Sequence, residues 1–241
     1  MMKKSGFTLA EVLITLGIIG VVASMTIPNL IANTNSAKFR SGAKKSISTL
    51  AQAGLMGMAQ FDVDYSGITT ACTSTPKNDI LPANQTICGL LNSTLTGTTM
   101  VTNSPYSSAG VAFNGGPNVG TTATGAAGIS NVAWLQMADG VIFAFSRSAQ
   151  GCTITGQLNA TKYGELNSTS ANCRGYIDVN GTTLPNKEVN CGSTETAGFQ
   201  DGTCIVHNNN NEMTDIFPVV FHDGQVEPYT RPARYVLTTS K

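Results

Sequence analysis

The sequence contains few charged residues. Of its 241 residues, 12% are charged, against about 25% in an average soluble protein. Lys and Arg together number 14, as do Asp and Glu, so the formal net charge is zero. Such a chain has no overall field to attract nucleic acid or anionic lipid, and no stripe of basic and aromatic residues marks a nucleic-acid surface. These features argue against a nucleic-acid partner.

Short catalytic motifs are also missing. The sequence has no G-x-S-x-G, no H-E-x-x-H and no P-loop. Its two histidines, His207 and His222, could each serve a triad with a serine and an aspartate, but surface or strand positions account for them better. We therefore expect a protein that is not an enzyme.

The six cysteines include no C-x-x-C pair, and all of them follow residue 71. An even number in a Gly- and Thr-rich region favours disulfides in an oxidising compartment, whereas free buried cysteines in a reduced protein are the alternative. Sequence alone does not determine the connectivity. Because pairing between neighbours closes the shortest loops, we predict three disulfides: Cys72–Cys88, Cys152–Cys173 and Cys191–Cys204.

One long apolar run stands out against this background. Residues 7–32 contain a single charge, Glu11, and a helix of this length spans ~39 Å, enough to cross a bilayer. A cleavable signal peptide, with a cleavage site at Ala23, is one interpretation. Glu11 opposes it, because a charge in a short apolar region hinders insertion, and the apolar run continues to Ile31. A plain membrane anchor is the second interpretation, although a carboxylate inside such an anchor usually marks function.

The third interpretation explains the carboxylate. A short leader containing Lys3 and Lys4 ends at Gly6, Phe7 follows, and Glu11 is the fifth residue counted from Phe7. Pro28 lies further along the same apolar segment. Over about the first thirty residues, this pattern closely resembles the N-terminus of type IV prepilins and type II secretion pseudopilins.

The resemblance implies a processing route and an assembly role. Prepilin peptidase would cleave between Gly6 and Phe7 on the cytoplasmic side and methylate the new amine of Phe7. Because a buried carboxylate is costly unless it is paired, Glu11 would meet the Phe7 amine of a neighbouring subunit during filament assembly. Pro28 would kink the helix. The implied partners are the peptidase, other copies and related pilins, and an inner-membrane assembly platform.

The expected location is the bacterial inner membrane, crossed once, with the head outside the cytoplasm and later in a pilus or pseudopilus. Basic residues flank the apolar run on both sides, so the positive-inside rule does not decide the orientation. The leader resemblance and the cysteines both place the head outside.

The sequence predicts four regions: a leader (1–6), a transmembrane or filament-core helix (7–32), an amphipathic helix half (33–61) and a globular head (62–241). Beyond Pro28, small and apolar residues recur at the spacing of a helix that buries one face. They are Ala43, Ile47, Leu50, Ala51, Gly54, Leu55, Met58 and Ala59. We therefore predict one helix from Phe7 to about Phe61.

In the head, residues 62–128 read as a long irregular connection that is rich in turn-forming residues. Apolar runs then surround Asp139-Gly140 and Asp223-Gly224, and a further strand leads to Asn180-Gly181. These dipeptides favour hairpins and turns. A long helix followed by antiparallel strands predicts an α+β, pilin-like fold, in which the helix packs on a β-sheet head with long disulfide-held loops.

The latter half of the chain also resembles, more loosely, a head pattern of pilin-like secretion proteins. The matching residues are Asp178, Asn180, Gly181, Pro185, Asn186, Asp215, Phe217, Phe221, Gly224, Val226 and Pro228. An insertion at 187–214, Pro218 and a wider phenylalanine spacing depart from that pattern.

A calcium site is the one cofactor prediction for the head. Some pseudopilins bind calcium in this part, and Asp178, Asn180 and Asp215 could gather near a turn and supply hard oxygen ligands. An EF-hand does not fit, because the glycine and glutamate positions are wrong. Turn capping by Asp and Asn is the alternative. No other cofactor is expected.

These features predict a structural subunit, processed by prepilin peptidase and polymerised into a type IV pilus or a type II secretion pseudopilus. The head pattern favours the pseudopilus slightly. Two alternatives stay open at this point: an adhesive minor pilin that captures a ligand or DNA, and a membrane-anchored hydrolase that uses pilin-type export.

Overall fold

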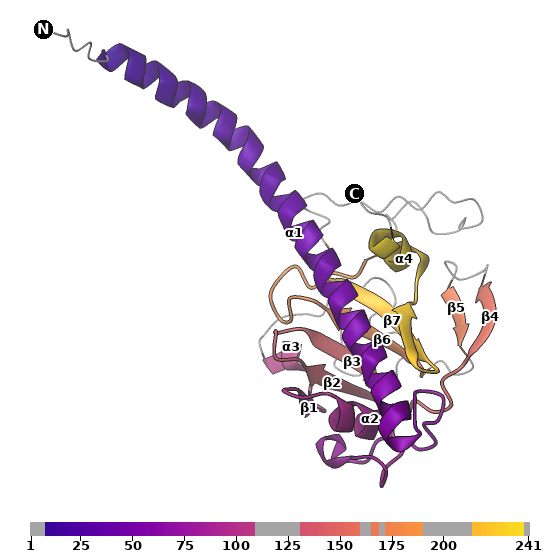
Figure 1. Cartoon of the computed structure of the whole chain (residues 1–241). Helices are drawn as coiled ribbons and strands as arrows, with labels where there is room; N and C mark the ends of the chain where they lie inside the picture. Colours follow the sequence, from indigo (N-terminus) through magenta and orange to yellow (C-terminus); the bar gives the residue numbers. More distant parts are fainter. Residues whose placement is uncertain (1–7, 109–130, 160–164, 169–171, 190–213, 239–241) are drawn as a thin grey trace, which may run out of the picture.

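A single long helix organises the molecule. The computed structural model describes residues 8–108, 131–159, 165–168, 172–189 and 214–238. Helix α1 (Leu9–Phe61) has 53 residues and is therefore ~80 Å long. In Figure 1 its first half projects away from the head and its second half lies along it. The predicted α+β fold, a long helix on an antiparallel sheet, is confirmed.

The sheet of the head has six strands in the order β1-β2-β3-β6-β7-β8, and every neighbouring pair is antiparallel. A separate hairpin pairs β4 with β5. The bounds of the strands are β1 (Thr99–Val101), β2 (Val132–Gln136), β3 (Ile142–Ser146), β4 (Ile154–Asn159), β5 (Glu165–Ser168), β6 (Arg174–Asp178), β7 (Ile216–His222) and β8 (Gln225–Pro228). The remaining elements are η1 (Pro76–Asn78), α2 (Ile87–Thr94), α3 (Pro105–Ser108) and α4 (Arg231–Thr238).

The predicted turns lie where the sequence places them. Asp139-Gly140 connects β2 to β3, and Gly140 has φ 87°. Asp223-Gly224 connects β7 to β8, where Asp223 has φ 47°. After β6, Gly181 has φ 65°. These left-handed conformations explain why Asp and Gly occupy the turns, since other residues adopt them at a cost.

The segment from 62 to 108 is more regular than predicted. It contains α2 and β1, so the prediction of a long irregular connection is wrong here; residues 109–128 lie outside the described ranges. Helix α2 begins at a capping residue, because Thr86 Oγ1 accepts a hydrogen bond from the N–H of Gly89 at 2.8 Å. Ile87 and Leu90 are fully buried. The helix is short and stabilised by tertiary packing, which sequence periodicity does not reveal.

The core consists of three groups of buried side chains. The largest fills the space between α1, α2 and one face of the sheet, where Phe143 and Phe145 of β3 lie. On the opposite face, Trp134, Ile142 and Ala144 pack with a tyrosine of α3. The third group joins α4 to the middle of α1. Alternate residues of β3 thus serve two cores, as the side-chain period of a strand requires.

The buried face of α1 agrees in part with the predicted one. Of the eight predicted residues, Ala43, Leu50 and Gly54 are buried, and Ile47 and Ala51 are half-buried against the core of the head. Ser36, Phe39, Ser46, Ala53 and Gly57 are buried as well. Leu55 and Met58 are 59% and 44% exposed, and Ala59 is also exposed, so the prediction was wrong for these three. Apart from Gly54, the buried positions follow a heptad-like line, and Leu55, Met58 and Ala59 lie off this line.

Two glycines allow the head to approach the end of α1. A Cβ at Gly57 would lie 2.5 Å from the carbonyl oxygen of Val63, and one at Gly54 would lie 2.8 Å from Cε2 of Tyr65. The hydroxyl of Tyr65 donates to the carbonyl of Leu50 at 2.6 Å. The chain therefore reverses tightly after α1 and packs against the helix that it has just left.

We predict that Gly57→Ala destabilises the head. The new methyl group would overlap a backbone oxygen, which a rotamer change cannot relieve, and overpacking of this kind costs about 1–3 kcal/mol. The better helix propensity of alanine, worth about 1 kcal/mol, offsets part of this cost. Thermal unfolding of the detergent-solubilised chain, followed by circular dichroism, should show a lower midpoint. The exposed-site control Gln60→Ala should melt like the wild type. A Gly57→Ala midpoint at or above the wild-type value would contradict the packing described here.

Candidate functional site

The first half of α1 is an apolar surface without cover. Residues Leu9–Pro28 form a 20-residue segment of mean hydropathy 2.1. No residue in its most apolar stretch is buried against the described part of the chain. Leu9 is 77% exposed and Leu16 is 61% exposed. The segment is long and apolar enough to cross a membrane. An apolar surface of this size is not stable in water and needs lipid or other protein around it.

Glu11 caps the helix to which it belongs. The carboxylate oxygen Oε2 accepts from the backbone N–H of Thr8 at 2.8 Å and from its hydroxyl at 2.9 Å. In return, Thr8 Oγ1 accepts from the N–H of Glu11 at 3.3 Å. This is a capping box. The capping box was not among the predictions, although Thr-x-x-Glu before an apolar run is the sequence signature of such a box.

One oxygen of the Glu11 carboxylate is left for another partner. The bonds to Thr8 use Oε2, and no described residue donates a hydrogen bond to Oε1. Gly6 and Phe7 lie outside the described residues. The pairing of Glu11 with a Phe7 amine therefore stays a prediction, but the geometry leaves an acceptor for it.

Pro28 lies inside α1, which continues through it without a break. Figure 1 shows that the projecting half of the helix curves relative to the half on the head. Proline is a common cause of helix bending. Whether Pro28 produces a kink stays a prediction.

A pair of buried aspartates lies at the end of β6 and just before the start of β7. Asp178 ends β6 and is 1% exposed, and Asp215 precedes β7 and is fully buried. Asp178 Oδ2 accepts from the hydroxyl of Tyr106 at 2.7 Å, and its Oδ1 accepts from the N–H of Asn180 at 3.2 Å. The two oxygens of Asp215 accept from the N–H groups of Asn186 and Lys187, at 2.9 and 2.6 Å.

Burial raises the pKa of both carboxyl groups. For Asp178, loss of hydration and then the charge of Asp215 raise the pKa to about 8, despite the hydrogen bond from Tyr106. For Asp215, loss of hydration raises the pKa to about 6, against the opposing effect of the two backbone N–H donors. The phenol of Tyr106 also has a raised pKa, because it is buried and lies beside Asp178.

The structure brings together Asp178 and Asp215 as predicted, and Asn180 with them, but the arrangement resembles turn capping. Calcium needs six to eight oxygen ligands whose lone pairs face the ion. Here the carboxylate oxygens face N–H and O–H groups, which present hydrogen atoms rather than lone pairs. These residues therefore do not fit a calcium ion in this conformation. Calcium binding is a prediction that stays untested.

Two disulfides hold the loops of the head. Cys72 is bonded to Cys88 and Cys152 to Cys173, with Cα–Cα distances of 5.7 and 5.5 Å. Both pairs are the neighbours that the sequence analysis joins. The third predicted pair, Cys191–Cys204, lies outside the described residues.

A buried aspartate supports the first disulfide loop. Asp79 is 1% exposed and accepts hydrogen bonds from Thr73, Asn84 and Thr86. Its carboxylate lies near both sulfur atoms, but those sulfurs are bonded to each other. This group therefore organises the loop and is no metal site in the oxidised chain.

The geometry of His222 gives no support to hydrolase chemistry. His222 Nδ1 is 2.9 Å from Asp223 Oδ2, as in a triad, but its buried Nε2 has no hydrogen-bond partner among the described residues. A nucleophilic serine would have to bond at that nitrogen. The other candidate, His207, lies outside the described residues.

We predict that the two raised carboxyl pKa values make the head less stable as the pH rises. Because both folded-state values exceed the ordinary 3.8, the stabilisation is complete below pH about 4. It is lost progressively as the pH rises above that value, and the loss is complete above pH about 6 for Asp215 and about 8 for Asp178. The amide introduced by Asp178→Asn cannot ionise. This variant should therefore show a smaller fall in the free energy of unfolding between pH 6 and 8.

Urea unfolding of wild type and Asp178→Asn across this range measures the effect. Groups that titrate in both proteins cancel in the difference. Asp139→Asn is the matched control, since Lys45 lowers the pKa of Asp139 from an ordinary value that already lies below this window. Parallel curves for wild type and Asp178→Asn would show that Asp178 is not protonated in the folded head.

Comparison with known proteins agrees with the N-terminal geometry. Residues 1–27 match the family model described as the prokaryotic N-terminal methylation motif, the signature of the prepilin-type segment of type IV pilins and pseudopilins. The match includes the Gly6–Phe7 junction and Glu11. No curated protein and no solved structure matched the chain. The chain thus carries a prepilin-type segment at the start of a pilin-like α+β architecture.

Proposed function

We propose that this protein is a structural subunit that prepilin peptidase processes and that polymerises into a type IV pilus or a type II secretion pseudopilus. One observation carries the proposal. The methylation motif lies on a helix whose first 20 residues are exposed and apolar, and the same helix continues into the core of the head. An N-terminal segment that is cut off after export would not need to form one continuous helix with the core of the head.

The two halves of α1 suit two environments in turn. Before assembly, the exposed half lies in the inner membrane as a single span, where its apolar side chains are stable. In the filament, the same side chains pack against helices of other copies, with an assembly platform in the inner membrane guiding the transfer. The second half stays packed on the head in both states.

Glu11 then has a role that changes with the environment. In the isolated chain, the backbone N–H and the hydroxyl of Thr8 both donate hydrogen bonds to Oε2 of Glu11. Away from water a carboxylate needs a countercharge, and the methylated amine of Phe7 in a neighbouring copy supplies one at the free Oε1. Glu11 thereby sets the axial position of one subunit against the next.

The two disulfides support a head outside the cytoplasm, because such bonds persist in oxidising compartments. Within the pilin-like class, the head pattern around Asp178 and Phe217 favours a secretion pseudopilus over a pilus. Neither the described surface nor the net charge favours capture of DNA, and nothing in the described residues favours the hydrolase.

The processing step gives the first test. In the native host, the mature chain should begin at Phe7 with a methylated amine, because the leader ends at Gly6 and Glu11 is in register. Intact mass and N-terminal sequencing decide this. A mature chain that begins at Ser24 would establish an ordinary signal peptide and contradict the proposal.

The assembly step gives the second test. Glu11→Gln keeps the shape and the capping hydrogen bonds but removes the charge, and Glu11→Ala removes both. We expect both variants to insert and to be cleaved, but to enter filaments at a small fraction of the wild-type level. The measurement is the ratio of sheared, assembled protein to the membrane-bound pool.

Thr8→Ala is the matched control, since it removes the side-chain half of the capping box and keeps the carboxylate. It should assemble far better than either Glu11 variant, provided that cleavage is complete. Wild-type assembly of both Glu11 variants would rule out a role for the charge. Equal loss in Thr8→Ala and Glu11→Gln would assign the effect to the helix cap instead.

A further inference from the structure

One of the two described disulfides has a buried carboxylate beside it. The Sγ atoms of Cys72 and Cys88 and a carboxylate oxygen of Asp79 lie within 4.8 Å of one another, and all three residues are buried. Among the described residues, no carboxylate is grouped in this way with the sulfur atoms of Cys152 and Cys173. The two disulfides therefore differ in the charge that surrounds their sulfur atoms.

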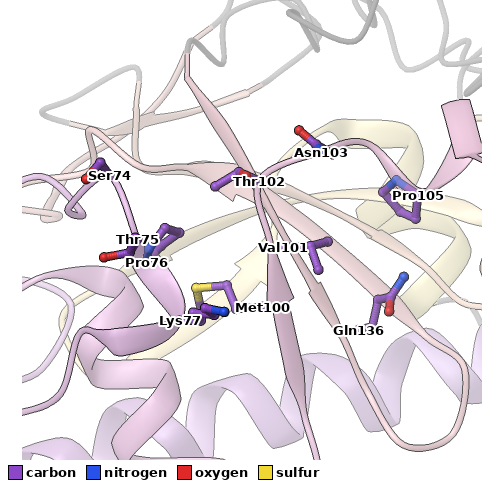
Figure 2. A pocket seen from close by; sticks show the side chains of 10 residues that line it. All are labelled: Ser74, Thr75, Pro76, Lys77, Met100, Val101, Thr102, Asn103, Pro105 and Gln136. Atoms are coloured by element: carbon purple, nitrogen blue, oxygen red, sulfur yellow. The ribbon is translucent and has the colours of Figure 1, made fainter.

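Main-chain hydrogen bonds hold Asp79 in this position. Asp79 follows η1, and its N–H donates to the carbonyl of Pro76. Nδ2 of Asn92, on α2, donates to the carbonyls of Pro76 and Asp79 at 2.8 and 2.9 Å. The preceding residues 74–77 line a cavity of about 630 Å³ beside β1 (Figure 2), and neither cysteine of the disulfide contributes to that lining. The place of Asp79 beside the disulfide is thus set by the loop itself.

Neutral groups surround the carboxylate of Asp79. Its oxygens accept from the N–H and hydroxyl of Thr73 at 3.0 and 2.6 Å, from Nδ2 of Asn84 at 3.3 Å and from the hydroxyl of Thr86 at 3.1 Å. Such a set of donors suits the ionised form, which only accepts hydrogen bonds. No described residue forms an ion pair with Asp79, and the guanidinium of Arg147 donates to the carbonyl of Thr73. A negative charge therefore stays beside the two sulfur atoms.

Cys88 lies where a helix favours a thiolate. It is the second residue of α2. The N-terminal end of a helix carries a partial positive charge, which stabilises a thiolate and makes a cysteine there reactive. Cys88 would thus be a good leaving group when another thiolate attacks the disulfide. The negative charge of Asp79 beside it opposes this effect.

We propose that Asp79 protects the Cys72–Cys88 disulfide against thiol–disulfide exchange. In this exchange, the thiolate of an external thiol attacks Sγ of Cys72, which is 7% exposed, whereas Cys88 is fully buried. A bond forms between the two sulfur atoms, the Cys72–Cys88 bond breaks, and its electron pair leaves on Cys88 as a thiolate. Asp79 repels both the incoming and the departing thiolate. This role goes beyond filament assembly and does not depend on it.

The test uses the full-length chain in detergent and three thiols of similar size: cationic cysteamine, neutral mercaptoethanol and anionic mercaptoethanesulfonate. Each is supplied at the same thiolate concentration. Alkylation followed by mass spectrometry then measures the reduction of each disulfide separately. For Cys72–Cys88, we expect cysteamine to react at least about tenfold faster than mercaptoethanesulfonate, because repulsion at this distance from a carboxylate is strong. Cys152–Cys173 should show a smaller ratio.

Asp79→Asn keeps the shape of the side chain and removes its charge. It should raise the rate with mercaptoethanesulfonate at least about tenfold and reduce the ratio between the cationic and anionic thiols to about threefold or less. Asp64→Asn is the matched control. Asp64 is also buried and accepts from the N–H groups of Ser66 and Gly67, but it is not grouped with either disulfide. This control should keep the wild-type ratio at Cys72–Cys88.

Three results would overturn the proposal. The first is a wild-type Cys72–Cys88 disulfide that reacts equally fast with all three thiols, and it decides the matter even if Asp79→Asn does not fold. The second is an Asp79→Asn variant with unchanged rates. The third is an Asp79→Asn variant in which all three thiols react faster by the same factor, at both disulfides. That pattern would assign the effect to a loosened head and not to the charge.

Discussion

The structure depends on the packing of the second half of α1 against the head. This contact follows one line of small and apolar residues, from Ser36 to Gly57, and glycine at its end lets Val63 and Tyr65 lie against the helix. Because α1 supplies part of the core, the head holds its second half in place, and its apolar first half extends away from the head. The position of the exposed apolar half therefore follows from the packing of the core.

Buried aspartates are the second recurring device. Asp64, Asp79, Asp178 and Asp215 are all buried, and each accepts a hydrogen bond from a backbone N–H of a loop. A head with long loops and few charges has many backbone donors to satisfy, and a carboxylate satisfies several at once. This use explains why the acidic residues of the head pattern gather around a turn.

The sequence predicted some elements well because their signals are local. The Asp-Gly dipeptides identify two hairpins, since few residues adopt a left-handed turn. The apolar run and Glu11 identify the prepilin-type segment. Predictions that depended on distant contacts were weaker: Leu55 and Met58 match a helical period but face outwards, and α2 escaped notice because its buried face is only two turns long.

By itself, the sequence determined the long helix and the antiparallel head, and it predicted the two disulfides that the described residues contain, because propensity, periodicity and loop length act over a few residues. Only the tertiary structure decided which side of α1 is buried and which groups donate to the oxygens of Asp178 and Asp215. Those outcomes depend on residues far apart in the chain, such as Gly57 with Leu90 and Tyr106 with Asp178, whose contacts exist only after the chain has folded.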